Sequence, residues 1–243
     1  MFLDEPQAAR IDAALQILGV RGVTVFGASG DGGSHFSFQA FDNYGIGKTL
    51  NEISCAFQLP CYPSDSPYLT SVGGTVWKSE IDPSSAPIAW SGSGSGFSWE
   101  FPMPSHQKNV VAAYLANTTG LPPAASFNSS GRAYPDISAV SIDGTSQSSP
   151  IVAGIFSLLL DQRLNKGLPP LGHLAPRLWA VATNFVGEAV RDVTSGNSKT
   201  SCNNGFPATH GWDPVTHYIP RRAKLALLMR CSAYRIKSPV ASD

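Results

Sequence analysis

Apolar side chains recur at helical spacing near the start of the chain. Within residues 6–18 the apolar positions are Ala9, Ile11, Ala14, Leu15 and Leu18. This spacing predicts an amphipathic helix, with Gly19 as its C-terminal stop. The run Val23–Phe26 is short, β-branched and aromatic, which predicts a strand buried on both faces. A helix followed by a buried strand favours an α/β sandwich.

Periodicity weakens in the middle of the chain. Residues 32–66 are rich in Gly, Ser, Asn and Pro, which predicts a long surface loop. Tyr68–Val72 has strand character and is expected to end at Gly73–Gly74. Ser91–Ser98 alternates Ser and Gly like a linker, but aromatic residues on both sides indicate an ordered loop held by a core.

The second half contains the clearest helical pattern, Ile151–Asn165, with Pro150 expected in the first turn. Its apolar run is too short to span a bilayer. From Trp179 onward we expect irregular structure, followed by a basic, apolar tail at 218–232.

The composition and charge of the chain limit its expected domain size and its expected partners. With 243 residues, 42% of them hydrophobic, the chain can bury one sizeable core. Its 17 basic and 17 acidic side chains cancel, so we expect neither a nucleic-acid partner nor an anionic membrane surface. Residues 1–20 lack the features of a signal peptide. Either the protein is cytosolic or its true beginning is missing.

The four cysteines, at 55, 61, 202 and 231, match no paired C-x-x-C zinc spacing. Cys55 and Cys61 either form a small disulfide or stay free thiols. Sequons at Asn117 and Asn128 would suit a secreted protein.

Two motifs carry candidate chemistry. Gly144–Pro150 reads G-T-S-Q-S-S-P and precedes the long helix. There Ser146 is either a nucleophile near the positive end of the helix dipole or part of an ordinary N-cap. Ser29–Gly32 reads S-G-D-G and follows the buried strand. Asp31 is either a ligand-facing acid at a strand end or an Asx-type turn residue.

Taken together, these motifs resemble the sedolisin family of serine-carboxyl peptidases. Further matching stretches are Ser66–Thr75, Ser93–Ser98, Gly131–Ile137, Asp192–Thr194 and Gly211–Thr216. The resemblance implies an α/β, subtilisin-like three-layer sandwich with a mainly parallel sheet, incomplete at the N-terminus. Residues 1–216 would be a partial catalytic domain and 217–243 a divergent tail.

The resemblance also implies roles for single residues. Ser146 would be the nucleophile and Asp31 would line the oxyanion hole, where it must be protonated to donate a hydrogen bond. A glutamate base, oriented by an aspartate, titrates about two units below histidine and therefore suits acidic pH. The expected reaction is hydrolysis of a peptide or protein substrate, by tripeptide release or internal cleavage. A monomer that is lysosomal, vacuolar or extracellular is expected, made as a proenzyme.

A calcium site is implied near the end of the domain. Asp192 and Asp213 would supply carboxylates, and Val193, Thr209 and Gly211 would supply carbonyls, which suits Ca²⁺ as a hard cation. Both aspartates could instead be loop turn-formers.

The sequence departs from the family in three places. Only 30 residues precede Asp31, and they match a later segment than the one that carries the base, so Glu5 and Asp12 are poor substitutes. The connection from Asp136 to Ser146 is short, which predicts a displaced serine. The third break follows Thr216. Impaired catalysis is therefore expected.

Two alternatives stay open. A Ser/His/Asp subtilisin would need His35 or His106 as its base, the only histidines upstream of the serine. An inactive pseudopeptidase or fragment would act as a binding module.

Overall fold

The computed structural model describes residues 5–37, 43–79, 85–142, 144–185, 189–200 and 202–220. The helices are α1 (Glu5–Val20), α2 (Gly47–Phe57), α3 (Lys108–Asn117), a short 3₁₀ turn at Ala124–Ser126, α4 (Thr145–Leu164) and α5 (Ala175–Asn184). The strands are β1 (Phe26–Ala28), β2 (Thr70–Trp77), β3 (Pro87–Ala89), β4 (Gly96–Pro102), β5 (Gly131–Tyr134), β6 (Ile137–Val140), β7 (Val190–Arg191) and β8 (Ile219–Pro220).

Strand β2 organises the central sheet. It pairs in parallel with β1 and with β6, and in antiparallel with β3. Val72 is opposite Ala28 of β1 and also opposite Ile137 of β6, so these two strands lie on opposite edges of β2. Both run in the same direction as β2, and the loops that leave them therefore emerge at one end of the sheet.

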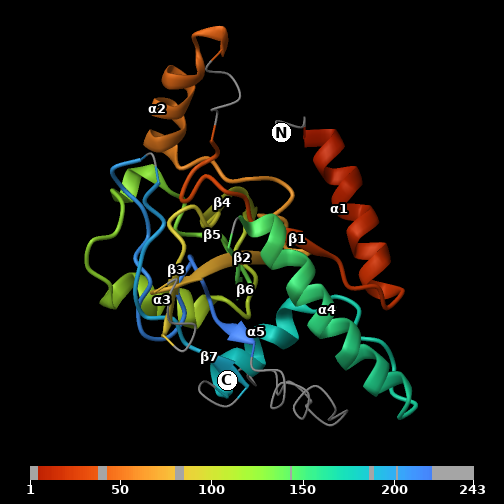
Figure 1. The fold of residues 1–243 in the computed structure, drawn as a ribbon. Coiled ribbons are helices and arrows are strands. Elements are labelled where there is room, and N and C mark those ends of the chain that lie inside the picture. Colours follow the sequence, from red (N-terminus) through yellow and green to blue (C-terminus); the bar gives the residue numbers. More distant parts are fainter. Residues whose placement is uncertain are drawn as a thin grey trace, which may run out of the picture.

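Helix α4 packs against β1, β2 and β6, and Figure 1 shows it running across these strands, with α2 set apart at one end of the molecule. One core lies between this helix and the sheet, around Val72, Ile137 and Phe156. A second core, rich in aromatic rings, surrounds Phe97 and Trp212. These two cores fix the sheet and its covering helices, from which the site loops extend.

The predicted N-terminal helix and the strand after it are both present, but their ends differ from the prediction. Helix α1 runs to Val20, past the expected stop at Gly19. Gly22, with φ +87°, takes the left-handed conformation after the helix. The strand begins at Phe26 instead of Val23.

The predicted surface loop at 32–66 is wrong in part, because α2 lies inside it. Ser34, His35 and Ser64 within the same stretch are buried. The composition signalled turns, whereas Leu50, Ile53 and Phe57 recur at helical spacing.

Strand β2 does not stop at its glycines but continues to Trp77. A Cβ on Gly73 would lie 2.7 Å from Pro135 Cγ, so the glycine permits close packing and does not end the strand. Helix α4 starts at Thr145, which places Pro150 inside the helix instead of in its first turn. Trp179 belongs to α5 and not to irregular chain. The Ser91–Ser98 loop is ordered, as expected, with Ser93 and Ser95 buried.

The disulfide joins Cys55 to Cys202, whose Cα atoms are 5.5 Å apart, and Cys61 is a free cysteine. The Cys55–Cys61 disulfide is therefore wrong, and the alternative of two free thiols holds for Cys61 but not for Cys55. Cys231 lies outside the described residues. Among the described helices, none has the length and apolar character needed to cross a membrane. The domain boundary after Thr216 stays a prediction, although the structure buries His217 and Tyr218. The rest of the predicted tail, from 221, is outside the described part.

Candidate active site

Asp31 lies in a tight turn that leaves the end of β1. The amide of Ser29 donates to the Val72 carbonyl at 2.9 Å, which continues the strand pairing up to the turn. Gly94 N–H donates to the Gly30 carbonyl at 2.7 Å, and Gly33 N–H donates to the Gly92 carbonyl at 2.9 Å. The glycine-rich loop after β3 therefore holds the Asp31 turn from both sides.

The start of α4 meets this turn directly. Asp31 Oδ1 accepts hydrogen bonds from the Thr145 amide at 2.8 Å and the Thr145 hydroxyl at 2.9 Å. The Gly30 amide donates to Thr145 Oγ1 at 3.1 Å. A Cβ on Gly144 would lie 3.1 Å from Asp31 Oδ2, so a side chain there would crowd the carboxylate. The two sequence motifs thus meet through Thr145.

Ser146 is the second residue of α4 and is exposed. Among the described residues its hydroxyl has no hydrogen-bond partner. Pro150 carries no N–H, so the Ser146 carbonyl receives no intrahelical bond from the residue four positions on. The short connection was expected to displace Ser146, yet its neighbour Thr145 stays in contact with Asp31.

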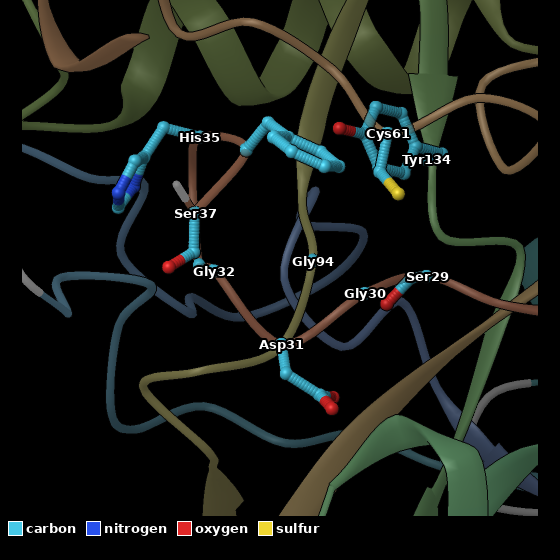
Figure 2. A pocket seen from close by; sticks show the side chains of 11 residues that line it. Ser29, Gly30, Asp31, Gly32, His35, Ser37, Cys61, Gly94 and Tyr134 are labelled. Atoms are coloured by element: carbon cyan, nitrogen blue, oxygen red, sulfur yellow. The ribbon is translucent and has the colours of Figure 1, made fainter. Parts of the chain in front are cut away.

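A pocket of about 250 Å³ lies beside Asp31 (Figure 2). In Figure 2 His35 and Cys61 lie on opposite sides of it, and the Asp31 carboxylate points away from Cys61 and Tyr134. Burial raises the pKa of the Cys61 thiol and of the Tyr134 phenol, so both are neutral donors. Ser29 also lines the pocket, and its buried Oγ has no hydrogen-bond partner among the residues described.

A buried ion pair supports the adjoining loops. Asp136 accepts from Arg132 Nη2 at 2.5 Å, from Trp179 Nε1 at 2.7 Å and from the Ser71 amide at 2.8 Å. These donors come from β5, α5 and β2. Arg132 and Asp136 lie in a stretch that matches the family, but their structural role was not predicted from the sequence. Their signal was two opposite charges four residues apart in an otherwise apolar segment.

The histidines of the subtilisin alternative lie in other surroundings. His106 packs edge-on against Trp179, with ring centroids 5.8 Å apart, and burial lowers its pKa to about 4. Burial also lowers the pKa of His35, which lines the pocket. In the part of the chain that the structure describes, neither histidine hydrogen-bonds Ser146.

Of the two acids expected to be poor substitutes for a base, the structure describes the side chain of Asp12. Asp12, buried on α1, accepts from the Ser66 hydroxyl at 2.6 Å and from the Tyr62 hydroxyl at 3.4 Å. Burial raises its pKa, against these two hydrogen bonds. It is therefore engaged in packing α1 onto the loop before β2. The side chain of Glu5 lies outside the described part.

The five residues predicted to bind calcium lie on two neighbouring loops. Asp192 Oδ2 pairs with His210 Nδ1 at 2.6 Å and accepts from the Gly211 amide at 2.9 Å. Asp192 Oδ1 is buried and has no hydrogen-bond partner within the described part of the chain. Asp213 Oδ1 accepts from the amides of Val215 and Thr216, both at 2.9 Å. Burial raises the pKa of Asp213 to about 7, and the charge of Asp192 adds to the rise.

Comparisons with known proteins give consistent likenesses. The chain is 36% identical over 227 residues to tripeptidyl-peptidase 1 of Bos taurus, covering 85% of this chain and 37% of that protein. It is 41% identical over 176 residues to tripeptidyl-peptidase 1 of Rattus norvegicus, covering 65% of this chain and 30% of that protein. The chain thus spans about a third of the length of these relatives. No family model matches it.

A solved structure is similar across most of the chain. It is Pseudomonas sedolisin (serine-carboxyl proteinase) complexed with two molecules of pseudo-iodotyrostatin, with a TM-score of 0.64 and 23% sequence identity. The match covers 93% of this chain and 61% of that one. This likeness confirms the predicted α/β, subtilisin-like fold.

Proposed function

Because the chain belongs to the sedolisin family of serine-carboxyl peptidases, we propose that it carries the nucleophile and oxyanion half of a site that hydrolyses peptide bonds at acidic pH. Ser146 is the nucleophile and Asp31 lines the oxyanion hole. The substrate is a peptide or protein, cleaved by tripeptide release or internally. The chain acts as a monomer.

One observation carries this proposal: Thr145 bonds Asp31 through both its amide and its hydroxyl. The residue beside the nucleophile is thereby fixed to the acid of the other motif. The contact places an acid, a helix N-terminus and an exposed serine in one small region. That combination suits stabilisation of a developing oxyanion next to an attacking hydroxyl.

The two oxygens of Asp31 have different roles in this proposal. Oδ1 accepts both bonds from Thr145, so the proton needed for donation to an oxyanion belongs on Oδ2. Ser146 Oγ attacks the carbonyl carbon of the scissile bond, and Oδ2–H donates to the oxygen that gains charge. Gly144 leaves space beside this oxygen.

Attack also requires a base to take the Ser146 proton. The glutamate and aspartate that supply it in the family are matched by none of the 243 residues. The family places them before the Ser-Gly-Asp-Gly turn, on a helix of their own. Cleavage by Ser146 therefore depends on carboxylates from outside the matched segment, and the 243 residues alone cleave slowly or not at all.

A chimera tests the proposal. The region of bovine tripeptidyl-peptidase 1 that precedes the matched part is joined to this chain, and cleavage of a peptide library is followed at pH 4 and pH 7. We expect cleavage at pH 4 that the chain alone lacks. Ser146→Ala in the chimera should reduce it about 10⁴-fold or more, since removing a nucleophile disables the catalytic group as a unit.

The neighbouring Ser149→Ala is the matched control and should leave cleavage unchanged. Equal cleavage by the chimera and its Ser146→Ala variant would sink the catalytic assignment. Peptide binding without cleavage, in both the chain and the chimera, would support the second candidate, an inactive peptide-binding module. The observation that favours this second candidate is that Ser146 is exposed and its hydroxyl has no hydrogen-bond partner among the described residues.

We also propose that Asp192, Val193, Thr209, Gly211 and Asp213 bind Ca²⁺. Asp192 Oδ1 is buried and has no partner among the residues that the structure describes, which suits a cation that prefers oxygen ligands. Asp213 lies near enough to Asp192 for the charge of Asp192 to raise its pKa. Bound calcium would neutralise the two carboxylates and fix both loops against the aromatic core. Chelation should lower the melting temperature of the wild-type protein but not that of Asp192→Asn. Equal melting with calcium and with chelator would exclude the site.

An oxidising compartment, lysosomal, vacuolar or extracellular, is part of the same proposal. The Cys55–Cys202 disulfide supports it, since such bonds persist mainly outside the cytosol.

A further inference from the structure

A histidine lies against the disulfide at the edge of the Asp31 pocket. Cys55 comes from α2, Cys202 from the loop after β7, and His35 from the segment after the Asp31 turn. Their ligand atoms, two sulfurs and a ring nitrogen, all lie within 4.8 Å of one another. Among the described residues, these three side chains form the group of histidine, cysteine or acidic residues whose ligand atoms are close enough to share a metal ion.

We propose that, when this disulfide is reduced, Cys55, Cys202 and His35 bind one Zn²⁺ ion, so that the same three side chains form either a disulfide or a metal site. A dithiol supplies the two electrons and two protons that convert the disulfide into two thiols, and it leaves as its own disulfide. Zn²⁺ then displaces both thiol protons to solvent and takes the lone pair of one His35 nitrogen. Two thiolates neutralise the charge of the ion.

The ligand set suits zinc, and reduction lets the two bonded sulfurs move apart toward the spacing that zinc needs. Thiolate sulfur and imidazole nitrogen are its usual ligands, at about 2.3 and 2.1 Å, which places the ligand atoms of a tetrahedral site about 3.5–3.8 Å apart. His35 is 4% exposed and Cys202 is also 4% exposed. A neutral imidazole donates a nitrogen lone pair to a metal, and thiolate sulfur supplies the other two ligands.

The three ligand segments are held together without the disulfide. Ser54, next to Cys55, donates its hydroxyl to the Phe36 carbonyl at 2.8 Å, which ties α2 to the His35 segment. Ser34 donates its amide to the Ser198 carbonyl at 3.1 Å and its hydroxyl to the Asn204 carbonyl at 3.2 Å.

A further bond, from the Thr200 hydroxyl to the Gly32 carbonyl at 2.7 Å, clamps the Cys202 loop to the Asp31 turn. Reduction therefore frees two sulfurs inside a scaffold that stays assembled. This prior assembly lowers the ordering cost of metal binding.

The site would couple redox state to the Asp31 pocket. His35 and Phe36 line that pocket, so a metal on His35 fixes one of its walls. The reduced and oxidised proteins would then present different pocket walls from one sequence.

The test uses a background variant, Cys61→Ser with Cys231→Ser, in which Cys55 and Cys202 are the remaining thiols. Protein is reduced with a dithiol, desalted without oxygen, supplied with excess Ca²⁺ and titrated with Co²⁺ and then Zn²⁺ against a chromogenic chelator. We expect one Zn²⁺ per chain and a thiolate-to-cobalt charge-transfer band. The same protein left oxidised should show neither.

His35→Gln is the decisive variant, because it keeps both cysteines and the disulfide. It should weaken Zn²⁺ binding by at least about 100-fold, the upper range seen for changes in the outer shell of metal sites. Cys202→Ser should remove the charge-transfer band. Circular dichroism checks that each reduced variant is folded. Equal zinc affinity of the reduced background and its His35→Gln form would overturn the proposal, as would a reduced background that binds no zinc.

Discussion

Asp31 and Asp136 are two aspartates in loops around the same central strand, yet their surroundings are opposite. Asp136 is fully buried, and donors from three elements occupy its oxygens. Asp31 is exposed, and its two donors both belong to Thr145. One of its oxygens has no donor among the described residues. The first carboxylate thus holds loops together, whereas the second keeps one oxygen without a donor among the described residues.

A resemblance by motif cannot distinguish the roles of these two aspartates. Both aspartates belong to stretches that match the family, and letters alone give them equal weight. Burial and the number of hydrogen-bond donors distinguish them. Breaking a buried ion pair lowers the free energy of unfolding strongly, whereas replacing an exposed carboxylate lowers it much less. Each role can be tested by a change that spares the other.

The largest effect on stability is expected from Asp136→Ala. It leaves the Arg132 guanidinium buried and uncompensated, and Trp179 Nε1 loses its acceptor. We expect unfolding to become easier by about 3–5 kcal/mol, the range for breaking a buried pair from one side. Urea denaturation followed by tryptophan fluorescence measures it. Asp161→Ala, an exposed aspartate on α4, is the matched control and should shift stability by less than about 0.5 kcal/mol.

The next effect falls on activity instead of stability. In the chimera, Asp31→Ala should lower kcat about 10²–10³-fold, as for loss of one oxyanion donor. Its free energy of unfolding should fall by about 1–3 kcal/mol, because the two Thr145 donors lose their partner. Steady-state kinetics and urea denaturation on the same preparation separate the two. A stability loss as large as that of Asp136→Ala would erase the distinction between the two carboxylates.

The smallest effect concerns His106, beside the Asp136 cluster. Burial lowers its pKa to about 4, with Asp136 raising it and Arg132 and His173 lowering it further. The unfolded chain binds a proton near pH 6.5 and the folded chain only near pH 4, so wild-type stability is lost as pH falls through this window. His106→Gln should remove up to about 3 kcal/mol of that loss. Denaturation at pH 7 and pH 4 measures it, and parallel curves for the two proteins would contradict it.

The sequence predicted those parts of the fold in which local pattern and tertiary packing agree. The helix around Leu15, the strand at Phe26 and the long helix after Ser146 follow from apolar spacing. The family motifs located Asp31 and Ser146, and the structure brings their segments together. The glycines of β2 were misread because Gly73 packs closely against Pro135 and Gly74 against Trp90, and both contacts depend on residues farther along the chain.

Other features depended on partners distant in sequence. Cys55 pairs with Cys202 across 147 residues, and with four cysteines no spacing rule selects that pair over Cys55–Cys61. Helix α2 was hidden by the Gly- and Ser-rich segments around it, although its own apolar spacing is helical. The start of α4 was placed too late because Pro150 was taken as a first-turn residue.

The bond between Asp31 and Thr145 also bears on how the chain folds. It joins residues 114 positions apart, so closing that loop carries a high entropic cost before any packing offsets it. Contacts of such long range form late and slow the folding of the domains that depend on them. During synthesis, the turn must wait for β6 and the start of α4 before it acquires its partner. A chain interrupted before residue 145 therefore exposes an acid and glycine-rich loops that lack their partner, and formation of the contact between Asp31 and Thr145 marks a late stage of folding.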